Sequence, residues 1–399
     1  MSGFYRVKHT KVLDPEGSQV MMRGVNVGGW LMMEGYFLHA PNLAVSKFKR
    51  EFAKALGVRA LLDLERSFND SFIREEDLKF IADSGFNSVR VPFHHGLIET
   101  KPYHYDADGL AYLDRVIAWG KKYGLAVMLD LHAAPGAQNH DWHSDSDGKA
   151  GLWTSKTCQD RVFALWEFLA DRYKDNPAVL GYDLLNEAVS ADPKLLNRFY
   201  KKLIKTIRGV DRNHILFVEG NRWAQDVSPL EDIDDDNMVV SIHFYEPIEF
   251  AFNLIPFLKY PLGSGSKKWH KPQIKKRLEG YARFSSRSKR PIHVGEFGVN
   301  YRQGLYGEDM CLRDVLACFK EFGFHWNYWT YKAVKNSMFP DGIYSYYPNS
   351  PWVNRQGPKT GWDTYAALWP THKNEIVRSW QTSEFTLNTH ILEELVHGR

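Results

Sequence analysis

Residues 110–132 read LAYLDRVIAWGKKYGLAVMLDLH. The first part, Leu110–Tyr123, is an amphipathic stretch, and the Gly124 that follows it is a typical residue for a helix end. The next run, Ala126–His132, is apolar almost throughout, as expected of a parallel strand that is buried on both faces. A helix, a glycine and a buried strand in this order predict one unit of an alternating α/β fold.

The same pattern recurs along the chain. Seven more apolar runs are predicted as strands: Met21–Gly28, Asn87–Phe93, Val179–Glu187, His214–Gly220, Met238–Tyr245, Pro291–Gly298 and His325–Tyr331. Further helices are predicted at Glu75–Ser84, Thr157–Tyr173, Pro193–Val210 and Leu312–Phe322. This alternation predicts an α/β protein that is a single (β/α)8 TIM barrel over residues 1–399, with the barrel at about 20–380 and a short amphipathic tail at 382–399. The alternative, a doubly wound sheet, would carry a GxGxxG turn after its first strand, and residues 24–30 lack that spacing.

Three segments are too long for a minimal barrel. They are Tyr36–Asn69 after the first predicted strand, Glu246–Gln273 after the sixth and Ala333–Trp362 after the eighth. Each follows the C-terminal end of a strand, so we expect all three loops on the face where barrel enzymes carry their active sites. Long insertions of this kind are usually functional.

The composition excludes several classes of protein. The chain has 51 basic and 48 acidic residues, a net charge of +3, and no basic run dense enough for a nucleic-acid surface. Lys267-Lys268 and Lys275–Arg277 are local clusters that we interpret as solvated faces. No apolar run approaches the roughly 18 residues of a membrane-spanning helix. We therefore expect neither a nucleic-acid nor a membrane partner, and the sequence indicates no oligomeric state.

The numbers of aromatic residues and cysteines give weaker evidence about the substrate and the cellular location than the strand pattern gives about the fold. Aromatics make up 14% of the chain, which suits the stacking of sugar faces on rings, although Trp-rich loops of a large barrel explain it equally well. The cysteines Cys158, Cys311 and Cys318 have no metal-ligand spacing, and the first twelve residues lack an apolar signal core. These features predict a reducing, cytoplasmic location.

Polar and titratable residues concentrate where the predicted strands end: Arg90, His132, Asn186, Glu187, Glu219, His243, Tyr245, Glu296 and Trp329. Glu187 ends the fourth predicted strand and Glu296 lies at the end of the seventh, so the two carboxyl groups can face each other across the barrel. Glycosidases need two such groups, one to protonate the leaving oxygen and one to attack the anomeric carbon or activate water. Either glutamate alone is equally well explained as an ion-pair partner at the barrel rim.

The neighbouring residues fit that chemistry. We expect Arg90 to hold Glu296 ionised, Tyr245 to donate a hydrogen bond to the same carboxylate, and His243 to lie beside Glu187. The acid Glu187 is expected to be protonated and Glu296 ionised in the resting enzyme, which predicts a bell-shaped pH profile.

Two further residues are expected to contact the sugar. Asn186 can hydrogen-bond its 2-hydroxyl, and Trp329 can form a stacking floor. Taken singly, His132, His243 and Trp329 are as well explained by packing in the core.

The chain resembles glycoside hydrolase family 5, a family of (β/α)8 retaining glycosidases. The matching stretches lie between residues 20 and 331: Arg23–Trp30, Val89–Pro92, Asp130–Gly136, Leu185–Glu187, His243–Tyr245, Gly295–Gly298 and Trp329. The resemblance implies Glu187 as acid/base and Glu296 as nucleophile. It also implies the family's eight functional positions at Arg90, His132, Asn186, Glu187, His243, Tyr245, Glu296 and Trp329. This chemistry needs no cofactor and no metal.

Within the family, the first stretch and residues 133–139 are most similar to the exo-β-1,3-glucanases and their β-glucosidase and β-mannosidase relatives. The sequence departs from that pattern at His140–Gly148, where Asp145-Ser146-Asp147-Gly148 resembles a calcium loop but lacks its closing glutamate. We expect this loop to wall the pocket instead, with Trp142, Trp153 or His143 touching the non-reducing sugar.

The sequence therefore predicts a retaining β-glycosidase whose substrate is a carbohydrate, exo-acting on β-glucosides or β-mannosides. Three alternatives remain at this point: an endo-acting glucanase or mannanase with the same glutamates, a transglycosylase, and a barrel that binds carbohydrate without cleaving it.

Overall fold

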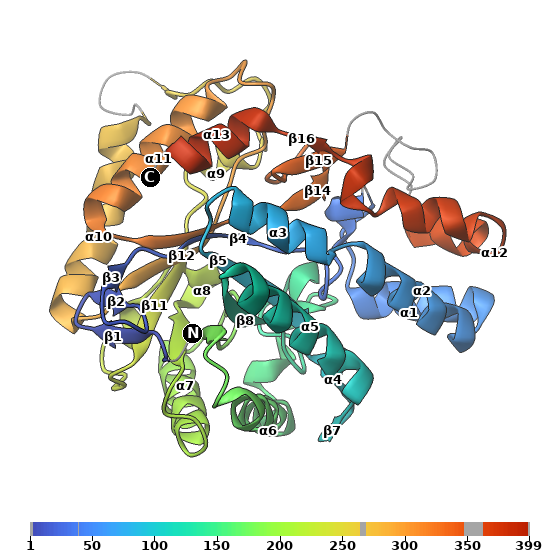
Figure 1. The fold of residues 1–399 in the computed structure, drawn as a ribbon, viewed down its shortest axis with the longest axis horizontal. Helices are drawn as coiled ribbons and strands as arrows, with labels where there is room; N and C mark the ends of the chain where they lie inside the picture. The colour runs from blue at the N-terminus through green and yellow to red at the C-terminus, as the bar shows by residue number, and fades with distance from the viewer. Residues whose placement is uncertain (1–2, 39, 264–268, 347–361, 398–399) are drawn as a thin grey trace.

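The computed structural model describes residues 3–38, 40–263, 269–346 and 362–397. Its centre is a closed barrel of eight parallel strands (Figure 1). In chain order these are β4 (Arg23–Asn26), β5 (Ser88–His94), β8 (Ala126–Ala133), β9 (Val179–Asp183), β10 (Ile215–Glu219), β11 (Met238–His243), β12 (Ile292–Phe297) and β13 (His325–Tyr328). Each strand pairs with the next, and β13 pairs with β4 to close the ring. The predicted barrel fold is confirmed, with all eight strands in the expected order.

Several predicted strands are shorter in the structure. The fourth ends at Asp183 instead of Glu187, so that Glu187 lies in a turn four residues beyond β9. Glu187 has a φ of 47°, a left-handed conformation that a strand does not contain. Arg90 also differs from the expectation, because it lies inside β5 with its side chain fully buried rather than at the end of a strand.

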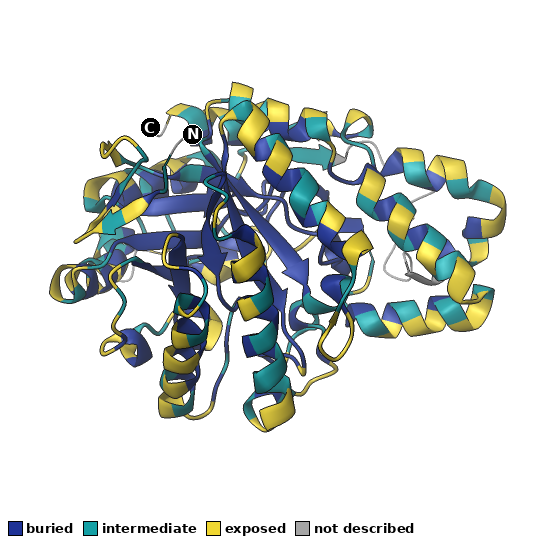
Figure 2. Ribbon diagram, turned by 60° about the horizontal axis from the view of Figure 1, so that its bottom comes forward, coloured by how far each residue is buried: buried dark blue, intermediate teal, exposed yellow. Residues whose placement is uncertain are grey.

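Helices surround the barrel: α3 (Glu75–Asp83), α5 (Ala107–Tyr123), α6 (Lys156–Tyr173), α7 (Pro193–Arg208), α10 (Lys271–Ser288) and α11 (Glu308–Phe322). Side-chain caps begin several of them, for example at Asp106 and Ser155, and Gly124 and Gly323 end α5 and α11 in the left-handed conformation. Figure 2 shows buried strands inside and helices whose outer faces are exposed. Residues 275–277 lie on α10, a helix that was not predicted from the sequence. Lys267 and Lys268 lie outside the described residues.

A small antiparallel sheet closes the N-terminal end of the barrel. It consists of β1 (Arg6–Lys8), β2 (Lys11–Leu13) and β3 (Gln19–Val20). Tyr5 and Val12 pack there with Met128 and Phe217 of the barrel strands. These apolar side chains fill the N-terminal end of the barrel, and the C-termini of the strands lie at the opposite end.

The segment after the first barrel strand is mostly helical. It forms η1 (Gly35–Leu38), α1 (Val45–Leu56) and α2 (Val58–Ser71), and α1 and α2 pack with α12 (Trp362–Ser379) beside the barrel in both views (Figures 1 and 2). Ser46 at the start of α1 donates its N–H to Asp145 Oδ1 in the loop after β8, so the segment begins on the active-site face, as expected. An apolar stripe of Phe48, Phe52 and Phe68 packs α1 and α2 against α12.

The remaining elements are short. They are β6 (Glu99–Lys101), β7 (His104–Tyr105), β14 (Lys332–Val334), β15 (Tyr344–Tyr346), β16 (Thr386–Leu387), α4 (His95–Ile98), α8 (Asn221–Ala224), α9 (Ile248–Ala251), η2 (Trp142–Ser144), η3 (Gly151–Trp153), η4 (Ser228–Leu230) and η7 (Thr382–Glu384). The C-terminal tail ends in α13 (Thr389–His397), which packs on α11 and buries Ile391 and Leu395. Among the described helices, none has the length and apolar character needed to cross a membrane.

Candidate active site

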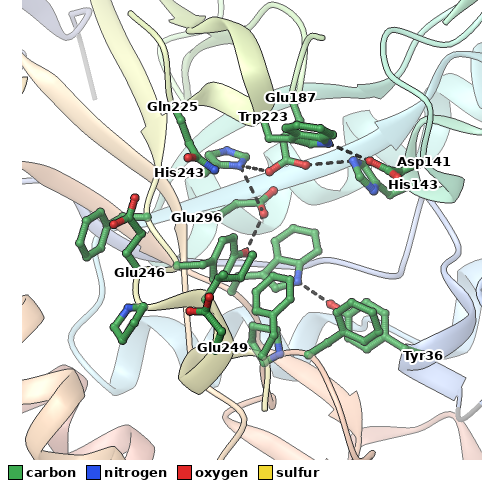
Figure 3. Close-up of a pocket in the computed structure, with 18 of the residues that line it drawn as sticks. Tyr36, Asp141, His143, Glu187, Trp223, Gln225, His243, Glu246, Glu249 and Glu296 are labelled. Carbon is green, nitrogen blue, oxygen red and sulfur yellow. Dashed lines mark hydrogen bonds and ion pairs between the residues drawn. The ribbon is translucent and has the colours of Figure 1, made fainter. Parts of the chain in front are cut away.

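A cavity of about 600 Å³ opens at the C-terminal end of the barrel (Figure 3). It is lined by polar groups on the barrel strands and by aromatic residues on the loops. The titratable residues in its wall are Glu34, Tyr36, His132, Asp141, His143, Glu187, His243, Tyr245, Glu246, Glu249, Tyr281 and Glu296. The face that the barrel rule predicts for an active site is thus the face that carries this cavity.

Glu187 and Glu296 lie close together at the floor of the cavity. Each places a carboxylate oxygen within 4.8 Å of the other and of His243. Two carboxyl groups about 5–5.5 Å apart suit retention through a covalent intermediate, because inversion needs about 6.5–9.5 Å to admit a water molecule. The closeness of the two groups therefore favours the retaining geometry.

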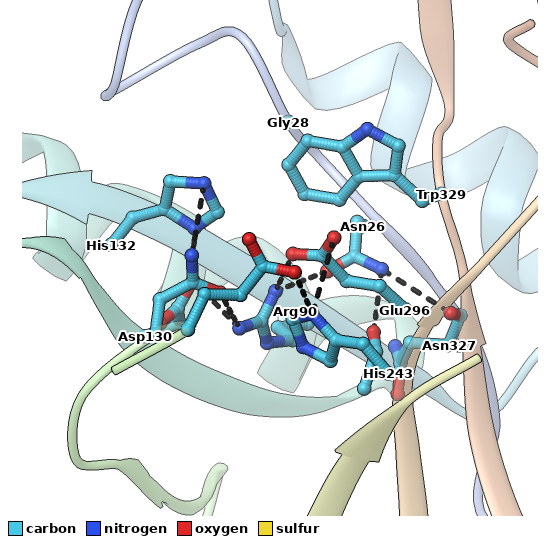
Figure 4. A network of polar contacts seen from close by, with 12 residues as sticks. Asn26, Gly28, Arg90, Asp130, His132, His243, Glu296, Asn327 and Trp329 are labelled. Atoms are coloured by element: carbon cyan, nitrogen blue, oxygen red, sulfur yellow. Dashed lines mark hydrogen bonds and ion pairs between the residues drawn. The ribbon is translucent and has the colours of Figure 1, made fainter. Parts of the chain in front are cut away.

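The buried guanidinium of Arg90 holds this floor together (Figure 4). Its Nη1 donates to Glu296 Oε1 at 2.9 Å, and its Nη2 donates to Glu219 Oε1 at 3.0 Å and to Asn186 Oδ1 at 2.8 Å. Its Nε donates to Asp183 Oδ2 at 2.8 Å. One planar cation thus fixes side chains from several strands of the barrel at once.

More carboxyl groups than cations lie around Arg90, and the pKa values of three of these carboxyl groups are shifted from their ordinary values. Burial raises the pKa of Asp130 to about 8, and burial together with Glu219 raises that of Asp183 well above its ordinary value. Burial opposes ionisation of Glu219 too, but His243 and Arg90 lower its pKa below the ordinary value. We infer that Asp130 and Asp183 carry protons near neutral pH, which limits the net negative charge in the barrel.

Glu296 is held by both of its oxygens. Arg90 donates to Oε1, and the Tyr245 hydroxyl donates to Oε2 at 2.8 Å. Burial and the charge of Glu296 raise the pKa of Tyr245 well above its ordinary value, so its O–H stays a donor. Because both oxygens are fixed, the carboxylate has one orientation toward the cavity.

Two imidazoles hold Glu187. His243 Nδ1 lies 2.7 Å from Oε1, and His143 Nε2 lies 2.9 Å from Oε2. Burial would raise the pKa of Glu187, but the hydrogen bonds from His143 and His243 lower it well below its usual range. The expectation of a protonated Glu187 in the resting protein is therefore wrong, because the imidazoles hold the protons.

Comparison with known proteins agrees with this geometry. The family model described as Cellulase (glycosyl hydrolase family 5) matches residues 54–335. The chain belongs to this family. It is thus a retaining O-glycosyl hydrolase, as the resemblance predicted.

Its relatives differ in their names. A β-xylosidase of Phanerodontia chrysosporium is 30% identical over 346 residues, which cover 83% of this chain and 71% of that protein. Endoglucanase C of Acetivibrio thermocellus is 29% identical over 351 residues, which cover 79% of this chain and 92% of that protein. Endoglucanase Cel5A from Thermotoga maritima has the same fold, with a TM-score of 0.63 and 23% identity over 94% of this chain and 96% of that one.

The other predicted positions of this family 5 glycosidase surround the two glutamates. His132 Nδ1 lies 2.7 Å from Asp130 Oδ2, and its ring stacks on that of Trp329 at 5.4 Å between centroids. Trp329 lines the cavity, and its indole N–H donates to the Tyr36 hydroxyl. Asn186 is fully buried, with its amide oxygen bound to Arg90.

The loop that departs from the family pattern contributes Trp142 and His143 to the cavity wall. Trp153 does not line the cavity, so the expected contact between Trp153 and the sugar is not supported. Its indole N–H donates to the Gln138 carbonyl at 2.8 Å, and its ring packs edge-on against Phe199 of α7. Both contacts fix the base of the loop and turn the ring away from the cavity.

Glu34 was not among the residues predicted for the site. It is buried at the cavity wall, where Trp142 Nε1 donates to its Oε2 at 3.3 Å. Its Oε1 has no hydrogen-bond partner among the described residues, and burial raises its pKa to about 8. An acidic residue within the apolar run Leu31–Tyr36 was the signal that pointed to it.

Trp223 was also missed. Arg222, Trp223 and Ala224 have φ values of 53°, 56° and 60°, a left-handed turn that costs about 1–2 kcal/mol per non-glycine residue. Trp223 lines the cavity with 39% of its surface exposed, and its indole N–H donates to Asp141 Oδ2 at 2.8 Å. Strain of this kind is typical of functional positions.

Removing the central cation tests the organisation of the site. We expect Arg90→Met to abolish hydrolysis and to lower the free energy of unfolding by about 3–5 kcal/mol, because Glu219 and Glu296 lose their buried partner. Urea denaturation measures the stability change. The control, Arg115→Met, breaks an exposed pair with Asp70 and should cost no more than about 1 kcal/mol. An Arg90→Met protein as stable as wild type would contradict this account of the floor.

Proposed function

We propose that this glycosidase is exo-acting and removes one terminal β-linked sugar, a β-glucosyl or a β-mannosyl unit, from glycosides and short oligosaccharides. The observation that carries the proposal is an aromatic wall along one side of the cavity. The ring of Phe339 lies 5.1 Å from that of Tyr36, 5.6 Å from that of Trp142 and 5.4 Å from that of Phe252, between centroids.

These four residues, which we call the aromatic wall, come from the loops after β4, β8, β11 and β13. A polymer chain needs a groove that is open at both ends, whereas a wall on one side leaves room only for a terminal residue. Glu34 lines the cavity beside the wall, where its carboxyl group can bind a hydroxyl group of that residue. The wall and Glu34 together support a pocket for one sugar.

The names of the relatives support a glucosyl unit as the first choice. One is a β-xylosidase and another an endoglucanase, and xylose and glucose share their configuration at C2. Mannose differs there, so a β-mannoside is the second choice in this proposal.

The roles of the two glutamates follow from their partners. Glu296 attacks the anomeric carbon, and its bonds to Arg90 and Tyr245 keep it oriented for that attack. The glycosidic C–O bond breaks while Glu187 passes a proton to the leaving oxygen. Glu187 then takes a proton from the water molecule that cleaves the glycosyl–Glu296 ester, which returns the sugar with retained configuration.

A substrate panel tests the exo action. We expect fast release of 4-nitrophenol from a β-glucoside or β-mannoside and little cleavage of laminarin, carboxymethyl cellulose or mannan. Initial rates of phenol and reducing-sugar release measure both. Efficient cleavage inside the polymers, with inert aryl monosaccharides, would show an endo-acting groove and overturn the proposal.

Replacing each glutamate tests its role. We expect Glu296→Ala and Glu187→Ala each to lower kcat by more than about 1,000-fold, because each removes one of the two reacting carboxyl groups. Azide should restore turnover in both variants. It should give the α-glycosyl azide with Glu296→Ala, where it replaces the nucleophile, and the β-glycosyl azide with Glu187→Ala. Reversed or identical products would contradict the assignment, and Glu231→Ala, on the exposed surface, serves as the control.

The leaving group should contact Trp223. We expect Trp223→Ala to lower kcat/KM about 3–10-fold for a disaccharide or aryl glycoside, because the ring of the leaving group loses its stacking partner. A glycosyl fluoride, which has no such ring, should react at a rate within about twofold of wild type. Tyr103→Ala is the matched control, since Tyr103 is an exposed aromatic residue with left-handed backbone that does not line the cavity. Equal losses on all substrates would contradict the role of Trp223.

A further inference from the structure

The imidazole of His143 lies between the carboxylate of Glu187, which can accept a proton, and the side-chain amide of Asn139, which can donate a hydrogen bond. It lies on η2, in the loop that departs from the family pattern, and its Nε2 is 2.9 Å from Glu187 Oε2. The same Nε2 is 3.0 Å from the amide nitrogen of Asn139. That amide cannot be reversed, because its nitrogen also donates to the Glu187 carbonyl at 3.0 Å and its oxygen accepts from the Asp141 N–H.

These contacts favour two states of the ring. When Nε2 carries a proton, it donates to the ionised Glu187. When Nε2 has given that proton away, its lone pair accepts from the Asn139 amide. Asn139 is fully buried, so an alternative partner from solvent is excluded. The site therefore stabilises the imidazole both before and after it loses its proton.

We propose that His143 is a positioning residue and proton reservoir that supplies Glu187 with the proton it gives to the leaving group. The inference rests on the proposed glycosidase mechanism and adds a step to it. The Nε2–H bond of His143 breaks, an O–H bond of Glu187 forms, and Nε2 accepts from Asn139. Glu187 then gives this proton to the leaving oxygen, and in the second half-reaction the proton taken from water returns to Nε2.

The charges around His143 agree with this cycle. Three carboxyl groups face it: Glu187 from the turn after β9, Glu34 from the segment after β4, and Asp141 from its own loop. Burial opposes its charge, but these carboxyl groups raise its pKa to about 9. The rings of His132 and Trp142 also face it, and burial lowers the pKa of His132 to about 3, so that ring adds no charge near neutral pH.

The pH dependence follows from the raised pKa. His143 is charged below its pKa of about 9 and loses the stored proton as the pH rises through that value. We therefore expect the alkaline fall of kcat/KM of the wild type to lie near pH 9, well above the range in which a carboxylic acid titrates.

The test replaces His143 with glutamine, which keeps a donor beside Glu187 but cannot store a proton. We expect His143→Gln to lower kcat/KM for an unsubstituted phenyl glycoside about 10–100-fold, because this leaving group needs a proton. The 2,4-dinitrophenyl glycoside needs none and should lose less than about threefold. The alkaline limb of the pH profile should also move to lower pH. His140→Gln, an exposed histidine of the same loop, should change neither.

Other outcomes overturn the inference in distinguishable ways. If His143→Gln lowers kcat/KM equally for both glycosides and the alkaline limb of the pH profile does not move, His143 only lines the pocket and supplies no proton. If the variant folds poorly, NMR titration of the wild-type histidines decides instead. A resonance assigned to His143, as distinct from His243, that titrates near pH 9 supports the reservoir, and a His143 resonance that titrates near the ordinary value of histidine refutes it. A wild type that hydrolyses no glycoside would refute the proposed function itself.

Discussion

The burial of one guanidinium inside the barrel is the constraint on which the site depends. An unpaired charge in such an interior costs several kcal/mol, so Arg90 must be surrounded by acceptors. The acceptors come from strands all around the ring, including Asp183 on β9, Glu219 on β10 and Glu296 on β12. The need to satisfy one cation thus sets the relative positions of side chains that are far apart in the sequence. The nucleophile candidate is oriented by the same bonds that make the barrel interior stable.

The same arrangement buries more acidic than basic side chains, and this excess decides where protons reside. Asp130 and Asp183 become neutral, whereas His243, beside Glu187 and Glu219, is held as a cation with its pKa well above the usual value. The pKa of Glu187, which faces such a cation, is therefore lowered, although its proposed role is to donate a proton. The protonation state of Glu187 is therefore a property of the whole cluster and cannot be assigned from its role alone.

The sequence was sufficient for the barrel because parallel strands that are buried on both faces are largely apolar, and runs such as Ala126–Leu129 show this directly. It was less informative at the strand ends and for α10, whose buried stripe of Ile274, Leu278 and Tyr281 is hidden among charged residues. Strand order also brought Glu187 and Glu296 together on one face. The orientations of the Trp153 ring and the Glu34 carboxyl group could not be predicted, because they depend on partners such as Gln138 and Trp142, which only folding brings near.

The loop at residues 140–148 contacts both an aromatic residue of the cavity wall, Trp223, and a carboxyl group of the cavity floor, Glu187. Asp145 ties the loop to the protein through His94 and through the backbone of Ser46 at the start of α1. From that anchor, Asp141 holds the strained Trp223 at the mouth of the cavity, and His143 holds Glu187 at its floor. One segment therefore fixes both Trp223, which we propose contacts the leaving group, and Glu187, which we propose protonates it. In the proposed mechanism, a change in this loop that alters the fit of the leaving group also shifts the proton supply, because both depend on the same few residues of backbone.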